Sequence, residues 1–183
     1  MATETQKPWV IIVGAGPSGL LLALLLANKG IAVQVVDMNS ELDEQPRATH
    51  YSPPAIHELR RAGVIDEIRA QGFIPKSVSW RKFDGTYLTG IDNSIMFDDD
   101  DKLVCLPLHK LGKIIMHHLL QRPIARICWH YRVVDVGQDE NSAWVDVEKP
   151  TGKERLYAPY VVGCDGASSQ VRRSLFGPRF PGK

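Results

Sequence analysis

The start of the chain contains two short, mainly apolar runs. A loop and a longer apolar run lie between them. Val10–Val13 is uniformly apolar, which predicts a buried strand of a parallel sheet. Leu20–Ala27 is apolar on all sides, which predicts a helix buried between a sheet and its neighbours. Ile31–Val36 is the second β-like run. The order strand, helix, strand predicts an α/β fold.

Helical and β-like patterns continue along the chain. Apolar residues at helical spacing predict two further helices, over about residues 54–70 and over Leu108–Leu120. Ser77–Ile91 predicts a β-hairpin with its turn at Asp84 and Gly85. Three β-like runs then predict a β-meander, at residues 126–136, 143–148 and 154–158. Tyr160–Gly163 predicts a last strand, before a helix that Ser168 or Ser169 caps.

The sequence GAGPSG joins the first strand to the first helix. Gly14 permits a tight turn, Gly16 lets the backbone approach a pyrophosphate, and Gly19 lets the helix pack closely on the strand. Pro17 and Ser18 occupy the first helical turn, where a missing N–H is tolerated and the N–H groups face the anion. The loop therefore predicts a dinucleotide-phosphate site, and the alternative is a glycine-rich turn in an unrelated α/β protein.

Two acidic residues follow predicted strands. Asp37 lies about 20 residues beyond the glycine loop, where a carboxylate accepts hydrogen bonds from ribose hydroxyls. Asp165 follows the last strand, so we expect it at the same sheet edge as the glycine loop, accepting from cofactor hydroxyls. The alternative for Asp165 is a turn aspartate that caps the following helix.

Composition excludes several classes of function. The chain has 183 residues and a net charge of +1, which indicates neither nucleic-acid nor anionic-membrane binding. Leu20–Ala27 is too short to span a bilayer. Three widely spaced cysteines fit neither a disulfide framework nor a metal site and favour a reducing, cytoplasmic compartment.

Other candidate chemistry is weak. His117 and His118 are adjacent, so they do not share a helix face as two metal ligands would, and we predict no metal site. No serine lies in a GxSxG turn, and no residue is identified as a catalytic acid, base or nucleophile. The acidic run Asp98–Asp101 is interpreted as a solvated loop without a function.

Three segments together resemble the N-terminal part of the class A flavoprotein monooxygenases, which include para-hydroxybenzoate hydroxylase and phenol hydroxylase. They are VIIVGAGPSGLLLALLLANKGIAVQVVD, then Pro46–Ala48 with the helix that follows it, and YVVGCDGASSQVRRSLFG. The resemblance implies a Rossmann-like FAD-binding domain with a β-meander, and NAD(P)H- and O₂-dependent hydroxylation of an aromatic or polyketide-like substrate.

The resemblance also implies roles for individual residues. The glycine loop would bind the FAD pyrophosphate, and Asp37 would bind the adenosine ribose. Arg47 would lie near the flavin nucleotide, and the strand around Val134 would contact adenine through backbone groups. Asp165 belongs to the motif that serves both FAD and NAD(P)H in this family.

The sequence departs from the family in three respects. Asp37 stands where the family usually has glutamate. Leu108 stands where the family places glutamine or arginine, and leucine cannot donate a hydrogen bond to the flavin chain. A third motif, Gly-Asp followed by Ala and His, is absent. We therefore expect residues 1–183 to form a truncated FAD-binding domain, with residues 77–107 as part of a substrate-domain insertion and its sheet.

Two other functions stay open at this point. The chain could be a non-catalytic FAD-binding remnant, or a module that depends on a partner chain for the missing half. It could also be an NAD(P)-dependent dehydrogenase, which would bind a nicotinamide cofactor without a flavin.

Overall fold

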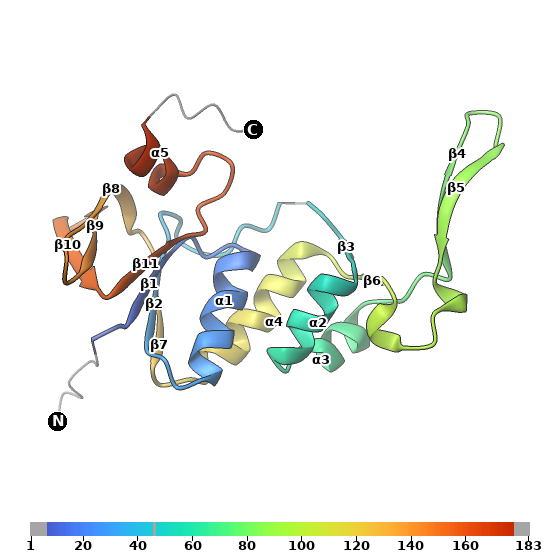
Figure 1. The fold of residues 1–183 in the computed structure, drawn as a ribbon, viewed down its shortest axis with the longest axis horizontal. Helices are drawn as coiled ribbons and strands as arrows, with labels where there is room; N and C mark the ends of the chain where they lie inside the picture. The colour runs from blue at the N-terminus through green and yellow to red at the C-terminus, as the bar shows by residue number, and fades with distance from the viewer. Residues whose placement is uncertain (1–6, 46, 178–183) are drawn as a thin grey trace. The chain divides into compact units, whose positions relative to one another are not determined.

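The computed structural model describes residues 7–45 and 47–177 (Figure 1). The chain divides into two compact units. The first unit is built from residues up to Glu44 and from Ile115 onward, and the second from Gln45–Ile114. Each unit is described separately below.

A parallel four-stranded sheet forms the centre of the first unit, as the apolar runs predict. Its strands have the order β11-β1-β2-β7 (Figure 1). The bounds are Val10–Val13 for β1, Val33–Val36 for β2, Ala125–Cys128 for β7 and Tyr160–Gly163 for β11. All residues of β1 and β2 are buried. Val13 pairs with both Val36 and Gly163, so the carboxyl ends of the three strands are level.

Helix α1 (Pro17–Asn28) packs on this sheet. The residues buried along one side are Gly19, Leu20, Ala23, Leu24 and Ala27. The other leucines of the helix, from Leu21 to Leu26, are half-buried. The prediction of a helix buried on all sides is therefore wrong for part of its circumference, because only the stripe that faces the sheet is fully covered.

An antiparallel meander completes the core of the first unit. Its strands are β8 (Arg132–Gln138), β9 (Ala143–Lys149) and β10 (Gly152–Ala158). Val133, Val145 and Val147 from the meander share one buried cluster with residues of the parallel sheet. Helix α5 (Gln170–Phe176) packs along β8.

The predicted β-like run over residues 126–136 is two strands in two sheets. Ala125–Cys128 joins the parallel sheet beside β2, and the meander begins only at Arg132. His130 separates the two strands with a φ of 62°, a left-handed conformation that lies outside the range of regular β-strands. The periodicity continues through this turn, which is why the sequence predicts one strand.

Two short helices open the second unit, where one helix over residues 54–70 is predicted. They are α2 (Pro53–Arg61) and α3 (Ile65–Gln71). Gly63 has a φ of 79°, and its N–H and that of Val64 close the end of α2 by bonding to the carbonyls of Arg60 and Leu59. This glycine cap ends the helix, although the apolar spacing continues beyond it.

Short strands accompany these helices. Strand β3 (His50–Tyr51) pairs with β6 (Val104–Cys105). Helix α4 begins and ends at the predicted residues, Leu108–Leu120.

The predicted hairpin is formed by β4 (Ser77–Arg81) and β5 (Tyr87–Asp92) (Figure 1). Its turn contains Gly85 with a φ of 88° and Asp84, whose carboxylate accepts from the Thr86 N–H. Apolar side chains on the hairpin are exposed, Trp80 by 55% and Tyr87 by 56%.

The acidic run after the hairpin is solvated at Asp98, Asp99 and Asp101, as the sequence predicts, but not at Asp100. A short turn η1 (Asn93–Ile95) leads to η2 (Asp99–Asp101), and Asp100 is only 8% exposed. The carboxylate of Asp100 forms ion pairs with Arg60 of α2 and Arg69 of α3. Two arginines from different helices thus compensate the buried charge.

Candidate functional site

The loops that follow β1, β2, β7 and β11 begin at the same edge of the parallel sheet. The Gly14 N–H donates to the Val36 carbonyl at 2.8 Å, and the Cys164 N–H donates to the Val13 carbonyl at 2.7 Å. The Asp37 N–H donates to the Cys128 carbonyl at 3.0 Å. Ligands of open parallel sheets bind outside the carboxyl ends of the strands, so this edge is the candidate site.

Two glycines of the loop are required by the fold itself. Gly14 has a φ of 107°, and a Cβ there would lie 2.4 Å from the Cys164 carbonyl oxygen. A Cβ at Gly19 would lie 2.0 Å from the Gly14 carbonyl oxygen. Any side chain at either position would collide with backbone atoms, so these glycines maintain the tight turn and the close packing of helix and strand.

Gly16 differs from both. It has an ordinary φ of −68°, and a Cβ placed there would have no atom within 4 Å. Neither conformation nor packing within the chain therefore requires glycine at this position. An unfilled space next to a helix N-terminus is what a bound phosphate group needs, and the geometry fits the pyrophosphate of a dinucleotide.

Helix α1 begins at Pro17, immediately after Gly16. Gly16 provides no side-chain cap, and the first turn has no acidic residue. Ser18 is exposed. The N-terminal N–H groups of a helix carry a partial positive charge, so the start of α1 favours an anion.

Asp37 connects the glycine loop to the loop after β2. Its Oδ2 accepts from the Ala15 N–H at 2.7 Å, and its Oδ1 accepts from the Asn39 N–H at 2.8 Å. Each carboxylate oxygen accepts more than one hydrogen bond, so capacity for ribose hydroxyls is left. Asp37 thus holds the loop in place in addition to its expected role toward a ligand.

Asp165 caps helix α5, which is the alternative that the sequence left open. Its Oδ1 accepts from the Ser169 hydroxyl at 2.6 Å, and its Oδ2 accepts from the N–H groups of Gln170 and Val171 at 2.6 and 3.1 Å. Ser169, the second predicted cap, accepts from the Arg172 N–H at 2.9 Å. The backbone of Asp165 adjoins Gly14, as expected for this edge.

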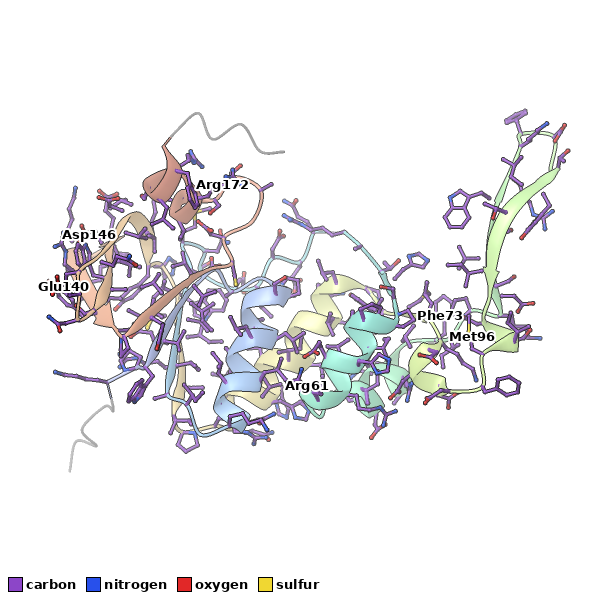
Figure 2. All side chains as sticks on the ribbon, in the orientation of Figure 1. Arg61, Phe73, Met96, Glu140, Asp146 and Arg172 are labelled. Atoms are coloured by element: carbon purple, nitrogen blue, oxygen red, sulfur yellow. The ribbon has the colours of Figure 1, made fainter. Side chains whose placement is uncertain are left out.

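Val134 lies at a β-bulge in β8, where the register with β9 shifts. Its carbonyl accepts from the side-chain amide of Gln170 at 2.9 Å. Sequence reasoning missed Gln170, because nothing in its neighbourhood signals a side-chain bond to a strand 36 residues away. The Gln170–Val134 hydrogen bond joins α5 to the meander. In Figure 2 the label Arg172 shows where α5 lies, and the label Asp146 shows where the meander lies.

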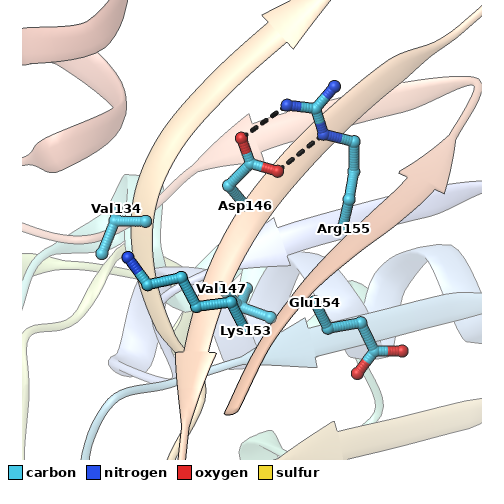
Figure 3. Close-up of a pocket in the computed structure, with 6 residues that line it drawn as sticks. All are labelled: Val134, Asp146, Val147, Lys153, Glu154 and Arg155. Atoms are coloured by element: carbon cyan, nitrogen blue, oxygen red, sulfur yellow. Dashed lines mark hydrogen bonds and ion pairs between the residues drawn. The ribbon is translucent and has the colours of Figure 1, made fainter.

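A cavity of about 310 Å³ adjoins the bulge (Figure 3). It is lined by Val134, Asp146, Val147, Lys153, Glu154 and Arg155. Asp146 and Arg155 form a bidentate ion pair, in which Nε of Arg155 donates to Oδ1 of Asp146 at 2.6 Å and Nη2 donates to Oδ2 at 2.7 Å. The Arg155 guanidinium lies over the Trp144 ring. Because these charges are paired across adjacent strands, they stabilise the meander and are not poised for catalysis.

The second unit contains one expected cofactor residue, Arg47, and Leu108, which stands where the family places a polar contact to the flavin chain. Arg47 is exposed, and Leu108 is the half-buried first residue of α4. Pro46, which the family resemblance includes, lies outside the described residues.

The remaining reactive side chains show no other site. Within residues 7–45 and 47–177, no group of three or more His, Cys, Asp or Glu could hold a metal ion. The three cysteines are free, and burial raises the pKa of each thiol, so the thiols are protonated at neutral pH. None of the described helices is long and apolar enough to cross a membrane.

Comparison with known proteins agrees with this geometry. A family model described as an FAD binding domain matches residues 7–183. Para-nitrophenol 4-monooxygenase of Pseudomonas sp. (strain WBC-3) is 33% identical over 168 residues, which cover 91% of this chain and 42% of that protein. The 6-hydroxy-3-succinoylpyridine 3-monooxygenase HspB of Pseudomonas putida is 33% identical over 180 residues, 97% of this chain and 46% of that protein.

A solved structure shows the same fold. The crystal structure of p-nitrophenol 4-monooxygenase PnpA from Pseudomonas putida matches with a TM-score of 0.87 and 31% identity, covering 93% of this chain and 44% of that one. The chain therefore spans less than half the length of these relatives.

The parallel sheet, the glycine loop and the acid at its carboxyl edge define a Rossmann-like dinucleotide-binding domain. Since the family model covers nearly the whole chain, this chain belongs to the FAD-binding domain family whose relatives include aromatic hydroxylases and monooxygenases. The cofactor of this family is FAD, and the expected α/β class and the family resemblance are confirmed.

Proposed function

We propose that this chain forms the FAD-binding part of a cytoplasmic monooxygenase that uses NAD(P)H and O₂ to hydroxylate an aromatic substrate. The single observation that carries the proposal is the space at Gly16, at the start of α1, where a Cβ would have no atom within 4 Å apart from those of its chain neighbours. The relatives that match over most of the chain are named as monooxygenases of nitrophenol and of a hydroxypyridine. Those names support an aromatic substrate.

The proposal assigns a role to each candidate residue. The N–H groups of Gly16, Ser18 and Gly19 bind the pyrophosphate, and Asp37 accepts from the adenosine ribose. Arg47, Val134 and Asp165 remain proposed cofactor residues, Asp165 by shaping the loop before α5 rather than by a free carboxylate. Bound FAD supplies the redox chemistry with O₂, while the chain binds and orients it.

We also propose that residues 77–107, which include the hairpin, are part of a substrate-binding insertion. The apolar side chains Trp80, Tyr87 and Ile91 are all more than two-fifths exposed. An isolated two-stranded hairpin is marginally stable in water, so an apolar face of this kind suits a sheet that continues with further strands.

Calorimetry with the purified 183-residue chain tests the proposal. We expect FAD to bind more tightly than NADH or NADPH. Tighter binding of a nicotinamide nucleotide, with no bound flavin, would favour a dehydrogenase and contradict the proposal. FAD binding without NAD(P)H oxidation would favour the non-catalytic remnant or a partner-dependent module.

Variants of two glycines, Gly16 and Gly19, test whether the glycine loop binds FAD. We expect Gly16→Val to fold with a melting temperature near that of the parent and to weaken FAD binding by about 100-fold or more, because its side chain fills the pyrophosphate space. Gly19→Val should instead lose the fold, since its Cβ collides with a backbone carbonyl. Thr151→Val, in the exposed turn between β9 and β10, is the control for an added apolar group. Parent-like FAD affinity in Gly16→Val would overturn the assignment.

A further inference from the structure

His130 lies in the connection that leaves the carboxyl end of β7, the strand next to β2. Its N–H donates to the Asn39 carbonyl at 2.8 Å, and the next N–H, of Tyr131, donates to the Asp37 carbonyl at 2.8 Å. Two consecutive hydrogen bonds therefore hold this connection against the loop that carries the proposed ribose acceptor. The site edge consequently includes His130 as well as Asp37.

The backbone conformation of His130 is unusual. Among the non-glycine residues that the structure describes, it alone has a positive φ, 62°. Glycine adopts this conformation without a steric cost, and asparagine adopts it more readily than most residues. The turn by itself thus gives no reason for an imidazole ring at this position.

The side chain of His130 is exposed. Within residues 7–45 and 47–177, its ring makes no hydrogen bond or ion pair, and its contacts to Asn39 run through the backbone. The ring therefore does not hold the loop together. A strained, exposed residue beside a ligand-binding edge is a candidate for contact with the ligand.

We propose that the imidazole of His130 contacts the adenine ring of FAD and forms one face of the adenosine site. The inference rests on the proposed function, because it requires FAD to bind at this edge with its ribose at Asp37. Adenine is a flat base, and stacking on an aromatic side chain contributes about a tenfold gain in affinity. His130 is then a binding residue, and the two backbone bonds place its ring next to the ribose.

His130→Asn separates the ring from the turn, because asparagine tolerates the same backbone conformation but has no ring. We expect dissociation constants for ADP and for FAD that are each raised about tenfold, with the melting temperature of the ligand-free chain unchanged. His130→Gly, which removes the strain, should melt no lower than the parent and lose the same affinity. The control is His117→Asn, at an exposed histidine of α4.

The outcomes differ clearly. Parent-like affinity for ADP in both His130 variants would overturn the inference, and so would weaker binding of FAD without weaker binding of ADP, since the ring would then act on the flavin half. Failure of the parent chain itself to bind FAD or ADP would instead contradict the proposed function on which the inference rests.

Discussion

Single residues at the carboxyl edge of the sheet connect the folding of the chain to the proposed binding site. Asp37 shows this most directly, because its two oxygens hold the N–H groups of Ala15 and Asn39. A role toward ribose alone would leave folding unaffected when the carboxylate is removed. The observed bonds instead join the glycine loop to the next loop, so loss of Asp37 disturbs the shape of the site before any ligand binds.

Asp37→Ala should accordingly lower the free energy of unfolding by about 1–3 kcal/mol in the absence of ligand, because the N–H of the buried residue Ala15 and the N–H of the exposed residue Asn39 lose a charged acceptor. FAD affinity should fall as well. Urea unfolding of the ligand-free chain measures the first effect, and Glu41→Ala, at an exposed carboxylate in the same loop, is the control. An unfolding midpoint equal to that of the parent would contradict the structural role.

Helices and strands show which parts of the fold can be predicted from sequence. Helix α4 begins and ends where its apolar spacing predicts, β1 follows from a uniformly apolar run, and β2 follows from a run that is apolar except at Gln34. These elements are determined by local pattern. Gly63 and His130 each end an element by adopting a positive φ, while the apolar period continues past them. A period measured over a window cannot detect a single residue in a different conformation.

Long-range contacts explain the other differences. Asp100 is buried because arginines 40 and 31 positions earlier in the chain reach it, and nothing in the acidic run itself indicates this. For Asp165 the sequence allows two roles; the hydrogen bonds at the start of α5 show that its carboxylate caps the helix, and its role toward a cofactor stays a prediction. The glycine loop can be predicted from the sequence because its spacing is local, whereas Gln170 and His130 depend on tertiary structure.

At the level of elements, Asp100 connects η2 to α2 and α3 and makes their packing sensitive to acid. The hydrogen bond from Arg60, with that from Arg69, lowers the pKa of the Asp100 carboxyl below its usual value. In the unfolded chain the pKa of an aspartate is about 3.9. Because the pKa of Asp100 is lower than this in the folded state, its ion pairs stabilise the fold fully at pH values above about 3.9. This stabilisation is lost as the pH falls through the pKa of the folded state.

The stability difference between the parent and Asp100→Asn should therefore be constant between about pH 5 and 7 and should shrink below about pH 4. Thermal unfolding across this pH range measures the difference. A difference that grows as the pH falls would show that the ion pairs do not stabilise this packing.

At the scale of the whole molecule, these 183 residues correspond to less than half of the relatives they match. The first unit contains the glycine loop that is proposed to bind the pyrophosphate and the proposed ribose acceptor, so FAD binding is expected of it. A hydroxylation that is coupled to NAD(P)H oxidation needs an enclosed, dry pocket around the reacting groups. The described elements form a dinucleotide site and one exposed hairpin.

We expect the 183-residue chain with FAD and NADPH to oxidise NADPH slowly and to release hydrogen peroxide in place of hydroxylated product. Oxygen consumption with and without catalase measures the peroxide, and product analysis with a phenolic substrate measures hydroxylation. Tightly coupled hydroxylation would show that this chain encloses its own substrate pocket.

The turn of the β4–β5 hairpin has a practical consequence. Lys82, Phe83, Asp84 and Gly85 are all exposed, and the backbone bonds of the turn join only residues of the hairpin itself, Lys82 to Thr86 and Gly85 to Lys82. Exposed loop tips of this kind accept inserted sequence. A peptide tag placed between Asp84 and Gly85 would attach the molecule to a sensor surface while leaving every residue of the first unit unaltered.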